Sequence, residues 1–224
     1  MKDNVVILFT RIPVAGKTKT RLMPKLTGED CVLLHRAFLL DIYAVLLNAN
    51  SDCDVAIFYE PCGDMRELVA LLPNAVLYHC QNGDGLGEKM NNAIKSMHGL
   101  GYKKCLLIGS DIPLLKTETI IKAFESLNSF DVVLGPSNDG GYYMIGTKEP
   151  CAKLFSLDKY GISSVLDKTI KAAASAGKSC FLGPRTLDVD EPEDLCELIK
   201  KLYAEPASVC IETRKVLKHL FIDE

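Results

Sequence analysis

The stretch "NVVILFTRIPVAGKTKTRLMPKL", residues 4–26, decides the fold class of this chain. It begins with a short apolar run, residues 4–10, ahead of a loop with proline and glycine, a pattern typical of a buried parallel strand. The loop contains no acidic residue and carries five cationic side chains: Arg11, Lys17, Lys19, Arg21 and Lys25. A first strand that leads into such a loop indicates an α/β protein that holds a small polyanion there.

The rest of the chain alternates strand and helix patterns. Further strands are expected at 54–60, 75–80, 104–111, 131–136, 141–146 and 179–184, and helices at 27–48, 65–72, 85–97, 118–128, 163–176, 191–203 and 208–221. We therefore predict a single-domain, three-layer α/β/α fold with a mostly parallel sheet over residues 1–203, and a C-terminal helical appendage over 204–224. Ligands of such sheets bind beyond the carboxyl ends of the strands.

Composition excludes several classes of function. The net charge of −3 argues against a nucleic-acid or membrane-surface partner, and no apolar run approaches the roughly 20 residues that span a bilayer. The N-terminal residues do not resemble a signal peptide, and the nine cysteines contain no Cys-x-x-Cys pair. We expect a cytoplasmic protein with reduced cysteines; the composition leaves the oligomeric state open.

The segment Ala15-Gly16-Lys17-Thr18 looks like the end of a P-loop, but the rest of the loop does not fit. Arg11 stands where the first glycine of a P-loop should be, and Pro13 removes a backbone donor. The basic chain then runs on to Pro24, so no helix starts after Thr18. These features argue against a P-loop kinase.

A second template fits the loop better. Sugar-nucleotide pyrophosphorylases carry a loop of the form A-G-x-G-T-R-[LM]-x-P-x-x-K, and "AGKTKTRLMPKLT" resembles it with one residue inserted and a lysine in place of the second glycine. Gly16 lets backbone amides approach a phosphate, and the cations of the loop would counter its charge. A solvated basic surface loop is the alternative.

Five motifs in order, "IPVAGKTKTRL", "GDGLGEKM", "IGSDIPLL", "LGPSNDGGYYMIG" and "LDVDEPEDL", resemble the GT-A-fold nucleotide-diphospho-sugar transferase superfamily. Within it they are most similar to the radical-SAM/selenodomain-associated transferase 1 family, kin of the molybdenum-cofactor and 2-phospholactate guanylyltransferases. Two positions depart from that family. Tyr160-Gly161 replaces its usual Trp and small residue, and Arg11 replaces a lysine, which bears on the substrate rather than the class.

Candidate metal ligands follow the fourth and seventh strands. A carboxylate at Asp111, just past a buried strand, suits Mg²⁺ or Mn²⁺, although an Asx turn is the alternative. Asp190 with Glu193 reads as a capping box with Pro192 in the first helical turn. The resemblance implies that Asp111 and Asp190 hold the metal, with Asp188 as the alternative second ligand.

The resemblance also implies the remaining site residues. Lys19, Arg21 and Asp111 would be catalytic, and the nucleotide would be bound by Gly16, Lys17, Lys19, Thr20, Arg21, Lys25, Gln81 and Gly87. The glycines near Gln81 could instead simply cap a helix. The acceptor would lie against Asp139, Gly140, Gly141 and Tyr142, which sequence alone reads as a β-hairpin turn.

These features predict a metal-dependent transferase that uses a nucleotide donor and a small-molecule acceptor. The basic loop favours nucleotidyl transfer from an NTP to a small phosphorylated acceptor with release of pyrophosphate, because its cations exceed what a diphosphate with its own Mg²⁺ requires. The family resemblance also allows a glycosyltransferase with an NDP-sugar donor. A non-catalytic nucleotide-binding protein is the third alternative.

Overall fold

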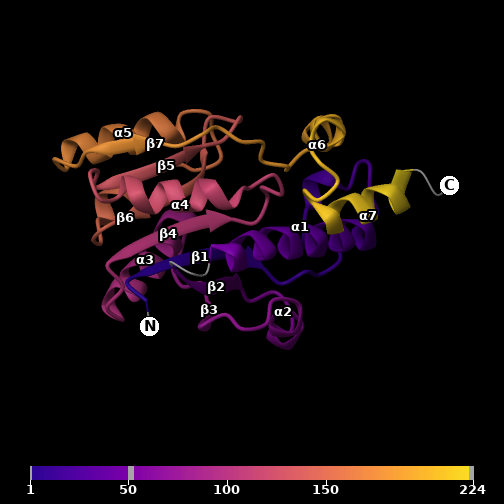
Figure 1. Cartoon of the computed structure of the whole chain (residues 1–224), viewed down its shortest axis with the longest axis horizontal. Coiled ribbons are helices and arrows are strands. Elements are labelled where there is room, and N and C mark those ends of the chain that lie inside the picture. The colour runs from indigo at the N-terminus through magenta and orange to yellow at the C-terminus, as the bar shows by residue number, and fades with distance from the viewer. Residues whose placement is uncertain (1, 50–52, 222–224) are drawn as a thin grey trace.

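The computed structural model describes residues 2–49 and 53–221, and within them seven strands form one sheet in the order β3-β2-β1-β4-β6-β5-β7 (Figure 1). The sheet is parallel except for β6, which runs antiparallel to both neighbours. This confirms the predicted mostly parallel sheet. The strands are β1 Asn4–Arg11, β2 Asp54–Glu60, β3 Leu77–Cys80, β4 Lys104–Gly109, β5 Val132–Pro136, β6 Tyr142–Thr147 and β7 Cys180–Leu182.

The helices fall where the sequence predicts them, within a few residues. They are α1 Gly28–Asn48, α2 Met65–Leu71, α3 Leu86–Gly99, α4 Thr117–Ser126, α5 Val165–Ser175, α6 Pro192–Ala204 and α7 Ile211–Phe221. Two short 3₁₀ turns, η1 Thr20–Leu22 and η2 Ala152–Phe155, were not expected. Among the described helices, none combines the length and apolar character that crossing a membrane requires.

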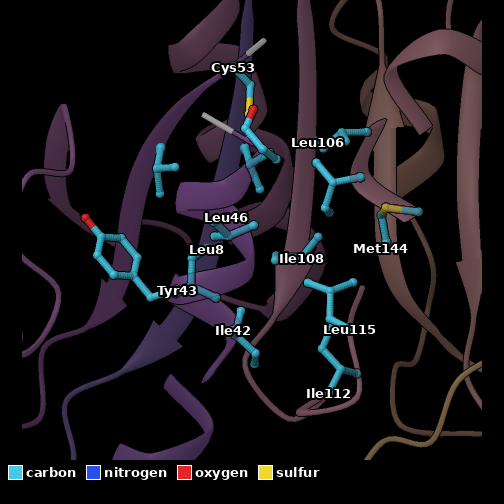
Figure 2. Close-up of a cluster of buried hydrophobic side chains, with 14 of the residues drawn as sticks. Leu8, Ile42, Tyr43, Leu46, Cys53, Leu106, Ile108, Ile112, Leu115 and Met144 are labelled. Carbon is cyan, nitrogen blue, oxygen red and sulfur yellow. The ribbon is translucent and has the colours of Figure 1, made fainter. Parts of the chain in front are cut away.

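Two apolar clusters sandwich the sheet, because successive side chains of a strand point to opposite faces. Val6 and Leu8 of β1 pack against α1, α2 and α4, in the cluster drawn in Figure 2. Val5 and Ile7 face the other way and pack against α3, η2 and α5. Both faces are therefore covered, which is why the strands are apolar along their whole length and the fold has three layers.

Capping boxes hold the starts of both α1 and α6. At α1, Thr27 and Asp30 form the reciprocal pair. At α6 the prediction was wrong: the cap is Glu191 and its partner is Asp194, one residue later than expected. Pro192 occupies the first turn as predicted. The side chain of Asp190 is therefore free of a capping role.

A third apolar cluster joins η1, the first half of α1, α6 and α7 at one end of the molecule (Figure 1). It includes Leu217 of α7, and the Asp41 carboxylate on α1 accepts hydrogen bonds from the backbone N–H groups of Glu212 and Thr213. Helix α7 is thus packed on α1 and capped by it. The same cluster brings the segment before α6 next to the basic loop.

Candidate active site

A cavity of about 900 Å³ opens at the carboxyl end of the parallel strands. Its walls come from the segments that follow β1, β3 and β4, as expected for an open α/β sheet, and from the β5–β6 turn and the segment before α6. The predicted site residues among its lining are Lys19, Thr20, Arg21, Gln81, Asp111, Asp139, Gly141, Tyr142, Asp188 and Asp190. The fold thus brings most of them together.

Lys19 is the central cation of this cavity. Its side chain is only 3% exposed, and Nζ donates to Asp111 Oδ1 and to the carbonyl oxygen of Val189, each at 2.5 Å. The ammonium also lies 5.1 Å from the centre of the Phe38 ring. The backbone of Lys19 has a φ of 52°, in the left-handed region that a non-glycine residue rarely adopts. Such conformations persist where surrounding contacts enforce them, often at functional sites.

Asp111 and Asp188 bring two carboxyl groups to the same place. The backbone carbonyl of Asp111 accepts from the Val189 N–H at 2.8 Å, which ties the residue after Asp188 to the end of β4. Burial is the largest single influence on Asp111 and opposes its ionisation, but the charge of Lys19, its hydrogen bond and the other nearby cationic groups together outweigh burial and lower the pKa of Asp111. Asp188 has no hydrogen bond or ion pair to another described residue, and burial together with the charge of Asp111 raises its pKa to about 8.

Asp190 is engaged differently. Its Oδ2 lies 2.5 Å from Nη1 of Arg21, and both side chains are well exposed at the mouth of the cavity. Its backbone N–H donates to the Asp194 carboxylate. Of the two acids considered as partners of Asp111, Asp188 is therefore the one without a cation of its own. Within residues 2–49 and 53–221, no three His, Cys, Asp or Glu side chains gather closely enough to form a metal site by themselves.

Five predicted nucleotide or acceptor residues do not line the cavity: Gly16, Lys17, Lys25, Gly87 and Gly140. Two of them are needed for packing instead. A Cβ on Gly87 would lie 2.2 Å from the carbonyl oxygen of Phe155, and one on Gly140 equally close to that of Ser163. Gly140 also has a φ of +87°. These glycines let η2 and the segment before α5 approach the site.

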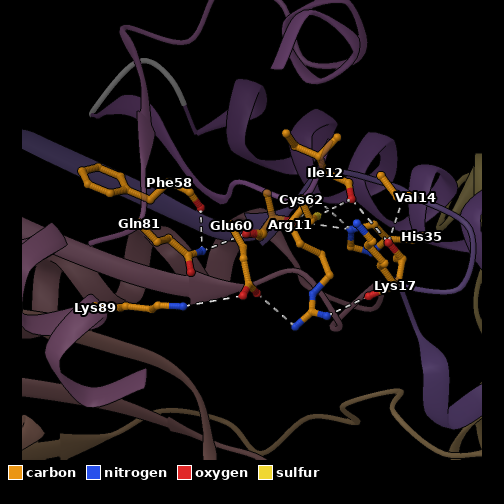
Figure 3. Close-up of polar contacts among 12 residues, drawn as sticks. Arg11, Ile12, Val14, Lys17, His35, Phe58, Glu60, Cys62, Gln81 and Lys89 are labelled. Carbon is orange, nitrogen blue, oxygen red and sulfur yellow. Dashed lines mark hydrogen bonds and ion pairs between the residues drawn. The ribbon is translucent and has the colours of Figure 1, made fainter. Parts of the chain in front are cut away.

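The sequence suggested that no acidic side chain faces the cations of the loop. The structure shows that some of them do have acidic partners. Arg11 donates to the carbonyl oxygen of Lys17 at 2.9 Å and lies 3.4 Å from the Glu60 carboxylate, which Lys89 also approaches to 3.6 Å (Figure 3). Glu60 and Lys89 line the cavity, and the sequence analysis missed both. The parallel register of β1 and β2, which pairs Arg11 with Glu60, could have suggested the first.

The side chain of Gln81 is held by two neighbouring strands. Its Nε2 donates to the carbonyl oxygens of Thr10 at 2.8 Å and of Phe58 at 3.1 Å (Figure 3). We expected Gln81 to offer a ligand both a donor and an acceptor. Because its donors are used within the protein, only its amide oxygen remains for a ligand.

His35 of α1 is a further lining residue that the sequence did not single out. Burial lowers its pKa to about 4. Its Nε2 lies 3.3 Å from the carbonyl oxygen of Arg11 and 3.3 Å from the hydroxyl of Thr10. Its buried Nδ1 has no hydrogen-bond partner among the described residues. No charged histidine therefore competes with Lys19 for Asp111 at neutral pH.

The predicted acceptor residues form the hairpin turn that sequence also indicated. The Ser137 N–H donates to the Gly141 carbonyl at 3.1 Å, and Asp139 Oδ1 accepts from the Gly141 N–H at 2.9 Å and from the Ser137 hydroxyl. The hydroxyl of Tyr142 is buried beside the side chains of Tyr160 and Thr169. The turn therefore presents Asp139 and Tyr142 to the cavity.

Comparison with known proteins places the chain in a family. Residues 39–162, more than half of the chain, match the family described as uncharacterized protein conserved in bacteria (DUF2064). The chain belongs to this family. The description of DUF2064 names no activity. Individual proteins that resemble this chain give more information about its chemistry.

A crystal structure of a candidate nucleotide-diphospho-sugar transferase from Desulfovibrio desulfuricans G20 is 30% identical, with a TM-score of 0.88 and full coverage of both chains. The 2-phospho-L-lactate guanylyltransferase of Methanobrevibacter smithii is 28% identical over 96% of this chain and 92% of its own. The 2-phospho-L-lactate guanylyltransferase of Methanocaldococcus vulcanius is 28% identical over 84% of this chain and 82% of its own length. Two predictions are confirmed: this DUF2064 protein has the GT-A-like superfamily fold, and it is a nucleotide-dependent transferase.

Proposed function

We propose that this protein transfers a nucleotidyl group from an NTP to a small phosphorylated acceptor and releases pyrophosphate. The observation that carries the proposal is the buried Lys19 ammonium, paired with Asp111 in the cavity beside Asp188, whose carboxyl has no ion-pair partner among the described residues. An oxygen of the acceptor would attack the α-phosphorus, and the bond from that phosphorus to the oxygen of the departing pyrophosphate would break. Positioning and charge neutralisation are what this reaction needs.

Two side chains of the basic loop would supply that neutralisation. Lys19 is fixed within the cavity and cannot swing away, because its backbone is strained and its ammonium is held at two points. Arg21 lies at the mouth and presents a planar guanidinium that can bind phosphate oxygens in pairs once Asp190 releases it. Thr20, between them, also lines the cavity and adds a hydroxyl.

The residues present fit a divalent cation, which we propose to be Mg²⁺ or Mn²⁺. Asp188 is a half-buried carboxyl with no hydrogen-bond or ion-pair partner among the described residues, next to the ionised Asp111, and Lys19 supplies a single positive charge for the two groups. Mg²⁺ is commonly held by one or two carboxylates plus substrate phosphates, so the missing third protein ligand is no obstacle. Asp111 and Asp188, rather than Asp190, would hold it. When bound, the ion supplies charge neutralisation on the phosphates.

Glycosyl transfer from an NDP-sugar is the second candidate. It is supported by the 30% identity to the Desulfovibrio protein, which is described as a candidate nucleotide-diphospho-sugar transferase. The guanylyltransferase names of the archaeal relatives favour nucleotidyl transfer and suggest GTP as the first donor to test.

The test is pyrophosphate release from each of the four common NTPs with Mg²⁺ and a panel of small phosphorylated acids, 2-phospho-L-lactate among them. We expect one NTP and one acceptor to give turnover that Asp111→Asn lowers by at least about 100-fold, because it removes charge stabilisation in the transition state. Asp167 is an exposed residue of α5, and Asp167→Asn, which removes an equal charge, should leave turnover unchanged. Turnover by the Asp111 variant equal to that of the unaltered protein would contradict the assignment.

A further inference from the structure

The end of the cavity at β2 and β3 holds three polar side chains that the phosphate chemistry does not use. Glu60 is the last residue of β2, Gln81 follows β3, and Lys89 ends the first turn of α3. All three line the cavity together with Leu86. This end therefore carries recognition groups separate from Lys19 and the aspartates.

The carboxylate of Glu60 and the ammonium of Lys89 form an acceptor and a donor side by side. Glu60 Oε1 lies 3.6 Å from Lys89 Nζ, and Oε2 lies 3.4 Å from Arg11 Nη2 (Figure 3). These contacts hold the carboxylate in place, yet its side chain remains 41% exposed and that of Lys89 25% exposed. A carboxylate oxygen has two acceptor sites and each oxygen of Glu60 is approached by one cation, so Glu60 can accept two further hydrogen bonds.

An apolar surface lies beside this pair. Leu86 is 46% exposed although it is a large hydrophobic residue, and it stands three residues before Lys89 on the same face of α3. The Gln81 amide is fixed by Thr10 and Phe58, so its oxygen is the third acceptor at this end of the cavity. The Lys89 donor, the Glu60 acceptors and the apolar Leu86 side chain together fit a flat ring that carries one acceptor and adjacent donors along its edge.

We propose that Glu60 and Lys89 select guanine as the base of the donor nucleotide. The inference rests on the proposed nucleotidyl transfer and names the residues that choose its base. Guanine carries O6 next to N1–H and an N2 amino group, so Lys89 donates to O6 while the two oxygens of Glu60 accept from N1–H and N2. Leu86 covers one face of the ring.

The other bases match this pair less well. Adenine presents the bare N1 lone pair to the carboxylate, and cytosine presents the N3 lone pair and O2. Uracil offers O4 and N3–H, but its O2 faces an oxygen of Glu60. A mismatch that sets an acceptor against a carboxylate costs more than a missing contact, because it leaves a charged group unpaired.

The test measures dissociation constants of GTP, ITP and XTP at a fixed Mg²⁺ concentration, which needs no acceptor. ITP lacks the 2-amino group, and XTP has an oxygen in its place. The unaltered protein should bind GTP about 10- to 100-fold more tightly than ITP, the range of a hydrogen bond to a charged group. Glu60→Gln should abolish that ratio and bind XTP more tightly than the unaltered protein does, because the amide can donate to the oxygen at C2.

Two further variants separate the roles. Lys89→Met should weaken GTP and ITP by the same factor, because both carry O6, and should leave their ratio unchanged. Glu67→Gln removes an exposed carboxylate on α2, outside the cavity, and should change no affinity.

The outcomes distinguish this inference from the function on which it rests. If the unaltered protein binds GTP and the Glu60 variant keeps the full preference for GTP over ITP, guanine selection by Glu60 is overturned while nucleotide binding stands. A Lys89 variant that changes the ratio but not the GTP affinity overturns the assigned pairing with O6. If the unaltered protein binds none of these triphosphates with Mg²⁺, both the inference and the proposed function fail.

Discussion

Replacing Lys19 with methionine removes the buried ammonium between Asp111 and the Val189 carbonyl while it nearly preserves side-chain volume. Removing one partner of a fully buried ion pair costs about 3–5 kcal/mol. The side chain of Lys19 is 3% exposed but that of Asp111 is 38% exposed to the cavity, so solvent screening lowers the expected cost to about 2–3 kcal/mol. At roughly 2–4 °C per kcal/mol, the melting temperature should fall by about 4–12 °C.

For the same variant, we expect added Mg²⁺ to restore part of the lost thermal stability. Without Lys19, Asp111 and Asp188 are left as an acidic pair with no cation, so added Mg²⁺ should raise the melting temperature of the variant more than that of the unaltered protein. Lys171→Met, at an exposed position of α5, is the matched control and should melt within about 1 °C of the unaltered protein.

Differential scanning fluorimetry with and without Mg²⁺ measures both effects, and turnover in the pyrophosphate assay measures a third. Loss of the fixed cation should lower turnover by about 100- to 1,000-fold, the range for removing one preorganised group that stabilises transition-state charge. A Lys19→Met variant that melts and turns over like the unaltered protein would refute the reasoning, because a buried ammonium held at two points cannot be removed without consequence.

Three other changes test the structure. Asp41→Ala should lower the free energy of unfolding by about 1–2 kcal/mol in urea titrations, because it uncaps α7 at two backbone N–H groups. Gly87→Ala should lower the free energy of unfolding by about 1–3 kcal/mol, because its Cβ would meet the Phe155 carbonyl oxygen at 2.2 Å. At the control position Gly99 a Cβ has no atom within 4 Å, so Gly99→Ala should be neutral or stabilising. Equal effects of the two changes would contradict the packing at Gly87. Because burial lowers the pKa of His35 to about 4, the unfolded chain binds its proton first, and stability should fall by up to about 3 kcal/mol as pH drops from 6.5 to 4. His35→Gln should flatten that part of the pH profile, and an unchanged slope would count against the burial of a neutral ring.

The fold could be predicted because its signals are local. Three elements are each determined by only a few neighbouring residues: the apolar strand β1, the Thr27–Asp30 capping box and the Asp139-Gly140 turn. The prediction erred where two local readings compete. Asp190 with Glu193 and Glu191 with Asp194 are both spaced as capping boxes, and only the packing of α6 on η1 and α1 selects the second.

The site could be predicted only in part, because partners come from distant segments. Sequence marked Lys19, Asp111 and Asp188, but it did not show that Lys19 is buried or that Asp188 has no ion-pair partner among residues 2–49 and 53–221. In sequence the basic loop has no acidic residue, but the fold supplies acidic partners from other segments. Strand β2 brings Glu60 to Arg11, and the segment before α6 brings Asp190 to Arg21. Gly87 and Gly140 were read as ligand contacts, although their close approach is to backbone carbonyls.

The most direct measurement follows the phosphate of the donor. With GTP labelled at the α-phosphorus, Mg²⁺ and a panel of small phosphorylated acids, the account predicts that label appears in a new product together with one equivalent of pyrophosphate. Asp111→Asn should lower the rate of both by at least about 100-fold. The central claim would be contradicted if the label stayed in GTP with every acceptor, or if γ-labelled GTP, rather than α-labelled GTP, passed its phosphate to the product.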